Sequence, residues 1–158
     1  MDKLIENLDF GAEGLWFPIT ISILLSIIVL FIPKRNITWR EIYITIGIVG
    51  FATWISDAVI ARTLDLIDLG DPNKTGIGEI FCYTLIPTSF SILYLNYLSK
   101  ENKWKITILF IVLSFLVEAG MLYFGYMKYN GWNLAFSFIA FVIAFGFLLP
   151  LHSKIIKM

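Results

Sequence analysis

The sequence predicts an all-α fold, an integral membrane bundle of five transmembrane helices. Of the 158 residues, 58% are hydrophobic and only 15% are charged, and the mean hydropathy is +0.81. A soluble domain is typically about half apolar and about a quarter charged. The charged residues also gather between long apolar runs. We therefore expect residues 1–158 to form a single transmembrane domain without a separate soluble domain.

Short connections join the apolar segments, so consecutive helices are expected to be antiparallel neighbours. Each segment has about 20 residues, the length that a helix rising 1.5 Å per residue needs to cross a bilayer. The first segment carries only hydroxyl groups among isoleucines and leucines, which places it at the periphery. Residues 1–14 are acidic, which argues against a cleavable signal peptide; a short interfacial helix and a solvated terminus both stay open. The predicted helices cover residues 15–33, 42–61, 77–98, 104–126 and 132–151.

The basic residues indicate the orientation in the membrane. Eight of the twelve lysines and arginines fall on one side of a five-helix topology, whereas the other four are accompanied by an excess of acidic residues. The positive-inside rule then places the N-terminus outside and the C-terminus inside. Tryptophans at both predicted interfaces agree with this orientation. The eight basic residues of the inner side are Lys34, Arg35, Arg40, Lys100, Lys103, Lys105, Lys154 and Lys157.

Three carboxylates interrupt the apolar segments, and all three fall in the predicted outer half of the bilayer. An ionisable group in hydrocarbon costs several kcal/mol or more, so a partner or a cavity is expected beside each one. Small and polar residues spaced three and four apart form a stripe on each of the last four helices. We therefore expect an outward-facing polar pocket between these helices. Its predicted ligand-binding residues are Asp57, Glu79, Glu118, Trp54, Tyr83, Tyr126, Trp132 and Asn133.

Two interpretations of the carboxylates stay open. Carboxylates that share a low-dielectric site repel one another, which favours a bound proton or cation, and nearby aromatic rings suit an organic cation or the head group of an amphiphile. Alternatively, Asp57 and Glu118 are struts that are protonated or hydrogen-bonded to amide and hydroxyl groups, while Glu79 stabilises a helix N-terminus. Pro87 frees a backbone carbonyl near Tyr83, either at a cavity or hinge or at a tolerated kink.

Several other classes of site are not indicated. The formal net charge is zero, which argues against nucleic acid as a partner. Cys82 is the single cysteine and no Cys/His cluster is present, so we expect neither a metal site nor a cofactor. His152, the single histidine, is expected at the inner interface. The acidic loop over residues 62–76 lacks the spacing of a calcium-binding loop, so a solvated loop is expected there.

Three segments carry a resemblance to a known group of proteins. They are TWISDAVI from Thr53, VEAGMLYFGYMKYNGWN from Val117, and the aromatic, serine-bearing start of the last helix. Over roughly residues 40–150 the chain resembles small five-helix integral membrane proteins of spore-forming Gram-positive bacteria. The resemblance implies the five-helix architecture and a multi-pass location in the bacterial cell membrane. It also gives weight to Asp57, Glu118, Tyr129 and Trp132, and it implies no substrate.

Three functions follow as expectations. The first is a protein that binds, transports or senses a cation, a proton or a lipid-like small molecule through its intramembrane carboxylates. The second is a membrane-embedded enzyme that acts on a lipid or isoprenoid with carboxylates as acid and base. The third is an accessory subunit whose small-residue stripes pack against a larger membrane partner. Membrane lipids are partners in each case, and a homo-oligomer and a larger membrane complex both stay open.

Overall fold

The computed structural model describes residues 7–74 and 76–157. All five predicted segments are helical, and their positions agree with the prediction to within a few residues at most ends. The predictions for residues 1–6 lie outside the described part of the chain. The elements are α2 (Trp16–Phe31), α3 (Trp39–Asp57), the π-helical turn η1 (Ala58–Thr63), β1 (Ile67–Leu69), α4 (Ile77–Tyr97), α5 (Lys103–Tyr123), β2 (Met127–Tyr129), α6 (Leu134–Ile143), the π-helical turn η2 (Ala144–Leu148) and α7 (Leu149–Ile156).

Four helices are long and apolar enough to cross a membrane. They are Trp39–Thr63, Ile77–Tyr97, Lys103–Tyr123 and Leu134–Ile156. The first predicted span is shorter, because α2 has 16 residues. The architecture is thus a helical bundle compatible with a membrane protein, with four candidate spans and a shorter apolar helix.

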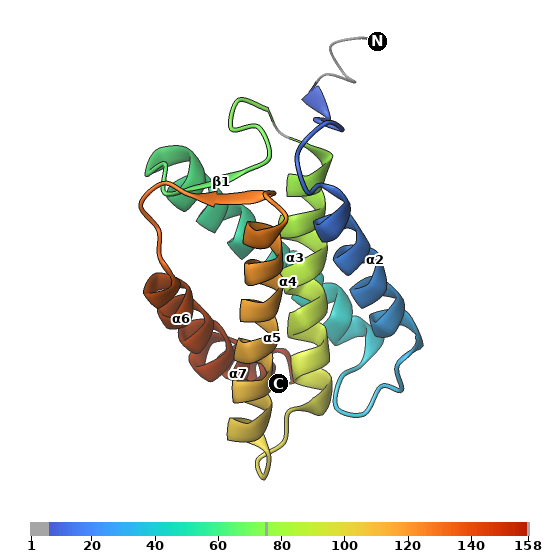
Figure 1. Cartoon of the computed structure of the whole chain (residues 1–158). Coiled ribbons are helices and arrows are strands. Elements are labelled where there is room, and N and C mark those ends of the chain that lie inside the picture. The colour runs from blue at the N-terminus through green and yellow to red at the C-terminus, as the bar shows by residue number, and fades with distance from the viewer. Residues whose placement is uncertain (1–6, 75, 158) are drawn as a thin grey trace.

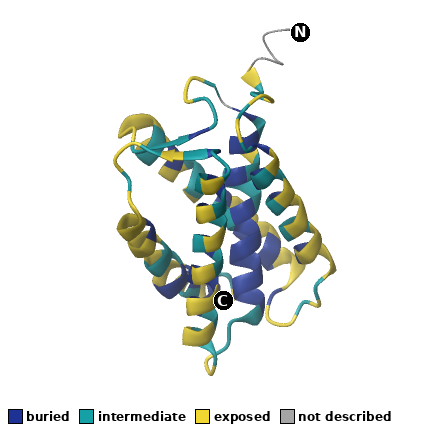
Figure 2. Cartoon of the chain, in the orientation of Figure 1, coloured by how far each residue is buried: buried dark blue, intermediate teal, exposed yellow. Residues whose placement is uncertain are grey.

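Helix α4 is the centre of the bundle (Figure 1). Both α2 and α3 pack along it, and most of its residues are buried (Figure 2). Its buried face contains the small polar residues Thr88, Ser89 and Ser91. Such residues allow close helix contacts in an apolar environment because they take little space and bond internally. A Cβ added at Gly50 of α3, for example, would lie 3.8 Å from the Thr88 methyl group.

Pro87 interrupts the backbone hydrogen bonding inside α4. A proline has no N–H, so the carbonyl four residues earlier, at Tyr83, loses its helical donor. The Thr53 hydroxyl of α3 lies 2.6 Å from this carbonyl oxygen and donates to it. The break in α4 is therefore closed by a neighbouring helix, as intramembrane proline sites require.

The last helical segment continues past Pro150 to Ile156, five residues beyond the predicted end. In η2 the Leu149 N–H bonds to the Ala144 carbonyl, a spacing of five residues. The next bond in this register would come from Pro150 to Phe145, and a proline cannot donate it. The Tyr94 hydroxyl, 2.6 Å from the Phe145 oxygen, donates instead. The helix thus tolerates the proline because α4 supplies the missing donor.

A short two-stranded ribbon, which the sequence did not indicate, closes one end of the bundle (Figure 1). β1 and β2 are antiparallel, with Ile67 opposite Tyr129 and Leu69 opposite Met127. The N-terminal segment joins them, since the Ile77 N–H donates to the Leu8 carbonyl and the Asp71 N–H donates to Asp9. We call this the ribbon end. The opposite end, with the connections at residues 32–38 and 98–102, is called the basic end.

Asn96 fastens the chain at the basic end. Its side-chain oxygen accepts the Arg35 N–H at 2.7 Å, and its side-chain nitrogen donates to the Pro33 carbonyl at 3.0 Å. Asn96 is fully buried, so these bonds compensate for its loss of hydration. They tie the connection after α2 to the last turn of α4.

Candidate functional site

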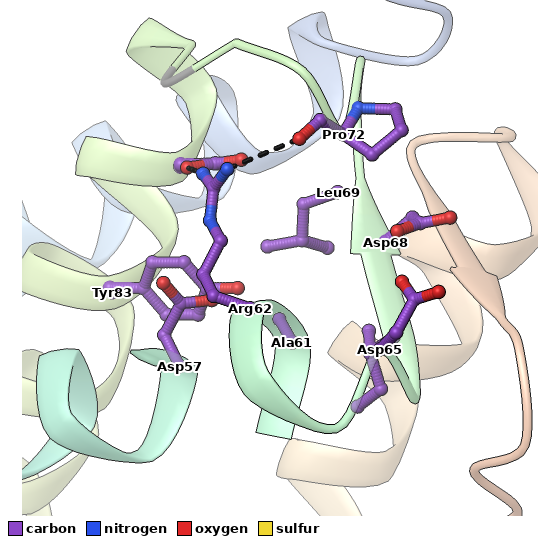
Figure 3. A pocket seen from close by; sticks show the side chains of 10 residues that line it. Asp57, Ala61, Arg62, Asp65, Asp68, Leu69, Pro72 and Tyr83 are labelled. Carbon is purple, nitrogen blue, oxygen red and sulfur yellow. Dashed lines mark hydrogen bonds and ion pairs between the residues drawn. The ribbon is translucent and has the colours of Figure 1, made fainter. Parts of the chain in front are cut away.

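A polar pocket of about 110 Å³ lies at the ribbon end, where α3 ends and α4 begins (Figure 3). The sides are formed by the last turn of α3, by η1 and by the first two turns of α4. The loop from Asp65 to Pro72, which includes β1, covers them. The lining residues are Asp57, Ala61, Arg62, Asp65, Ile67, Asp68, Leu69, Pro72, Glu79 and Tyr83.

Arg62 and Glu79 form an ion pair in this pocket. The Arg62 Nη2 lies 2.6 Å from the Glu79 Oε2, and the Glu79 side chain is only 5% exposed. Arg62 also donates to the Pro72 carbonyl at 3.2 Å, so it connects η1 to the covering loop and to α4. Glu79 lies in the first turn of α4, where the helix dipole favours a negative charge. The position of Glu79 is therefore fixed by two independent electrostatic contacts.

Asp57, the last residue of α3, is buried on the other side of the same pocket. The Tyr83 side chain lies against its carboxyl group (Figure 3). Within the described ranges, no lysine or arginine forms a salt bridge with Asp57. Of the two buried carboxyl groups in the pocket, Glu79 is thus paired with a cation and Asp57 is not.

The rest of the pocket adds negative charge. Asp65 and Asp68 come from the loop that was predicted to be solvated, and Asp68 accepts from Asn130 at 2.6 Å. Four carboxyl groups therefore line the pocket against the single guanidinium of Arg62. Among the residues that the structure describes, no three His, Cys, Asp or Glu side chains are grouped to hold a metal ion. The formal charge of the pocket lining is therefore negative.

The structure does not bring Glu118 to this pocket. Its Oε1 accepts from the Tyr129 hydroxyl of β2 at 2.5 Å and from the Ser137 hydroxyl of α6. Ser137 in turn accepts from the Trp132 indole N–H at 2.8 Å. Hydrogen bonds from tyrosine and serine hydroxyls are the contacts expected if Glu118 serves as a structural strut. They direct Glu118 towards α6, whereas Asp57 faces α4, which is why the three carboxylates do not share one site.

The Glu118 Oε2 has no hydrogen-bond partner although it is buried; across residues 7–74 and 76–157 it is the one buried side-chain oxygen or nitrogen in this state. Tyr129, which bonds the other oxygen, has its pKa raised above the ordinary value of about 10, first by burial and then by the hydrogen bond to Glu118. Tyr129 is therefore a neutral donor at physiological pH. Glu118 joins β2, α5 and α6 through a single oxygen.

The remaining predicted residues have individual roles. The Trp54 indole donates to the Thr84 hydroxyl at 3.2 Å, and its ring centroid lies 5.5 Å from that of Tyr83, so it supports the pocket wall. Asn133 caps α6 by accepting the Ala135 and Phe136 N–H groups. The last member of the predicted set, Tyr126, is buried against Gly78, and burial raises its pKa.

Sequence reasoning missed Arg62, Asp65 and Asp68 as members of the site. One signal was available, because Arg62 lies five residues after Asp57 at the end of an apolar run. A residue at that spacing returns to the same side of a widened π-helical turn, which η1 provides. The ribbon that folds Asp65 and Asp68 over the pocket had no comparable signal.

No protein-family model, no curated protein and no solved structure matches the chain.

Proposed function

We propose that this is a multi-pass cell-membrane protein that binds a small organic ammonium ion in the pocket at the ribbon end. The carrying observation is the unequal pairing of two buried carboxyl groups, since Glu79 bonds Arg62 at 2.6 Å and Asp57 has no salt-bridge partner in the described residues. An uncompensated carboxylate in a low-dielectric pocket gains most from an incoming positive charge. Asp57 would bind the ammonium group. The Arg62–Glu79 ion pair would hold the covering loop over the pocket through the bond from Arg62 to Pro72.

The size of the pocket supports a small ligand. Its volume of about 110 Å³ is well below the roughly 300–1,000 Å³ of sites for drug-sized molecules. A short alkylammonium ion fits this limit, with the Tyr83 ring beside the charge as a favourable cation–π partner. Asp65 and Asp68 at the loop side would attract cations towards the entrance.

The orientation in the membrane is part of the proposal. The ribbon end carries Asp9, Asp65, Asp68 and Asp71, whereas the basic end carries most lysines and arginines. By the positive-inside rule the basic end faces the cytoplasm. The pocket then opens to the outside, which suits binding or sensing of an external amine. If α2 is a fifth, shorter crossing beside the four candidate spans, the N-terminus and the C-terminus lie on opposite sides of the membrane.

Ligand-dependent thermal stabilisation in detergent tests the proposal. Ethylammonium is expected to raise the unfolding temperature with saturating dependence on concentration, because a ligand that binds only the folded state stabilises it. Ethanol, similar in size but neutral, and sodium chloride at matched ionic strength are expected to have no such effect. In Asp57→Asn the apparent affinity should fall at least about thirtyfold, since losing one partner of a buried charge pair costs about 2 kcal/mol or more.

Asp71→Asn is the matched control. Asp71 is a half-buried carboxylate at the same end and does not line the pocket; its side chain bonds Asn73 and Lys74 instead. This variant should keep the wild-type affinity for ethylammonium. An unshifted wild-type protein, or equal losses in Asp57→Asn and Asp71→Asn, would refute the assignment of Asp57 as the ammonium-binding group.

A further inference from the structure

A second and larger hollow lies on another face of the bundle, between α2 and α5. It has a volume of about 440 Å³ and is lined by apolar side chains throughout. Phe17, Leu24 and Ile28 of α2 form one wall, Leu113 and Val117 of α5 form the other, and Phe90 of α4 lies on the floor. We call it the α2–α5 groove. It shares no lining residue with the polar pocket.

The groove is closed towards the ribbon end. The Phe17 ring lies directly on α5 at Gly120, where an added Cβ would come within 2.2 Å of the ring. Phe124 packs on the same ring with centroids 5.1 Å apart. From this contact α2 leans away from α5 towards its C-terminal end (Figure 1). The groove is therefore a wedge that opens towards the basic end.

The length of the groove is sufficient for an acyl chain of one leaflet. From Phe17 to Ile28 the wall of α2 spans eleven residue steps, or about 16 Å at 1.5 Å per residue. Half of a bilayer's hydrocarbon core is about 15 Å. The Phe17–Gly120 closure lies near the ribbon end, seventeen residue steps or about 26 Å along α5 from Lys103, so an acyl chain of one leaflet that enters from the basic end terminates inside the groove before it reaches the closure.

Cationic side chains stand at the open end of the groove. On α4 the floor residues Phe90 and Leu93 share a helix face with Tyr97 at i+7 and i+4, and the Arg35 guanidinium lies over the Tyr97 ring at 5.5 Å. On α5, Lys103 is seven residues before the groove residue Phe110, and its ammonium group lies over the Trp104 ring at 5.2 Å. Neither cation forms a salt bridge with a residue in the described ranges.

From this arrangement we propose that the α2–α5 groove binds one acyl chain of an anionic phospholipid whose phosphate lies between Arg35 and Lys103. The apolar wedge selects a hydrocarbon chain, and its single open end fixes the head group beside the two cations. The anionic class follows from charge complementarity. The inference rests on the membrane placement proposed above and does not depend on ammonium binding at Asp57.

Native mass spectrometry of the delipidated protein in detergent tests this site. Phosphatidylglycerol and phosphatidylcholine with identical acyl chains are added in equal amounts, and the wild-type protein should retain one phosphatidylglycerol in preference. In Arg35→Ala/Lys103→Ala the preference should fall about thirtyfold, which corresponds to about 2 kcal/mol. Leu113→Trp should reduce retention of both lipids by filling the groove. Arg40→Ala/Lys154→Ala, which removes two basic residues away from the groove, should behave as wild type.

Equal retention of the two lipids by the wild-type protein, or an equal loss in the control pair, would overturn the proposal. The Arg35→Ala/Lys103→Ala variant must retain wild-type helical content by circular dichroism, which separates lost binding from misfolding. Vesicle flotation separates the two proposals. A protein that floats with vesicles but shows no lipid preference refutes the lipid site alone, whereas one that does not float refutes the membrane placement. Asp57→Asn should leave the lipid preference unchanged.

Discussion

The hydrogen bond between α3 and the broken turn of α4 gives a quantitative test of the fold. Thr53→Val keeps the volume of the side chain and removes the hydroxyl, so the Tyr83 carbonyl loses its donor at 2.6 Å. The helical donor is already absent because residue 87 is proline. A buried polar group left without a partner costs about 1–3 kcal/mol. We expect a loss of that size in the free energy of unfolding, measured by denaturant titration in detergent.

A double-mutant cycle isolates the reason for the loss. Pro87→Ala restores an N–H at the position that normally bonds the Tyr83 carbonyl, so Thr53→Val should cost less in that background. The expected coupling energy is about 1 kcal/mol, the net value of one hydrogen bond. Ser56→Ala is the matched control, because its hydroxyl donates only within α3, to Ala52, at an exposed position. It should change stability by less than about 0.5 kcal/mol.

The cycle tests whether the Thr53 hydroxyl replaces the backbone donor that Pro87 lacks. If Thr53→Val costs the same with proline or alanine at position 87, the hydroxyl does not compensate for the missing helical donor, and α4 must tolerate Pro87 for another reason.

Two further predictions concern the tyrosines of the ribbon end. Tyr129→Phe should destabilise the protein by about 1–3 kcal/mol, because Glu118 loses one of its two donors. Ser137→Ala should destabilise it more, because Trp132 also loses its acceptor. Thermal unfolding of both variants measures this order. Stability should also fall as the pH rises above about 10, because unfolded tyrosine loses its proton there, whereas burial raises the pKa of Tyr126 in the folded protein. The loss from one buried tyrosine reaches at most about 1.4 kcal/mol per pH unit. Tyr126→Phe should therefore flatten the slope of the unfolding free energy against pH. An unchanged slope would contradict the burial of Tyr126.

Helix positions were accessible from the sequence because hydropathy is summed over about 20 residues in each span. The polar stripes were accessible for a related reason, since helical spacing decides which residues share a face. Asp57 of α3 and Tyr83 of α4 were both predicted to line one pocket, and the Tyr83 side chain lies against Asp57 in the structure. The carbonyl freed by Pro87 was likewise predicted at Tyr83, although its partner was not.

The ribbon could not be predicted, because each strand has only three residues and the pairing joins Ile67 to Tyr129, which are far apart in the sequence. Short pairings of high sequence separation leave no periodic signal. The separate placement of Glu118 has the same origin. Its partner Tyr129 is positioned by the ribbon, and this contact turns the carboxylate away from Asp57.

The irregular points of the helices distinguish groups used for packing from groups left for a ligand. The carbonyls exposed by Pro87 and Pro150 each receive a hydroxyl from another helix, Thr53 in one case and Tyr94 in the other. A buried carbonyl left without a donor is costly, so these two contacts serve the packing of the helices. Asp57, by contrast, is buried without a cationic partner in the described part of the chain. This difference in pairing is why the proposal assigns Asp57, and not the satisfied carbonyls, as the group that would bind a ligand.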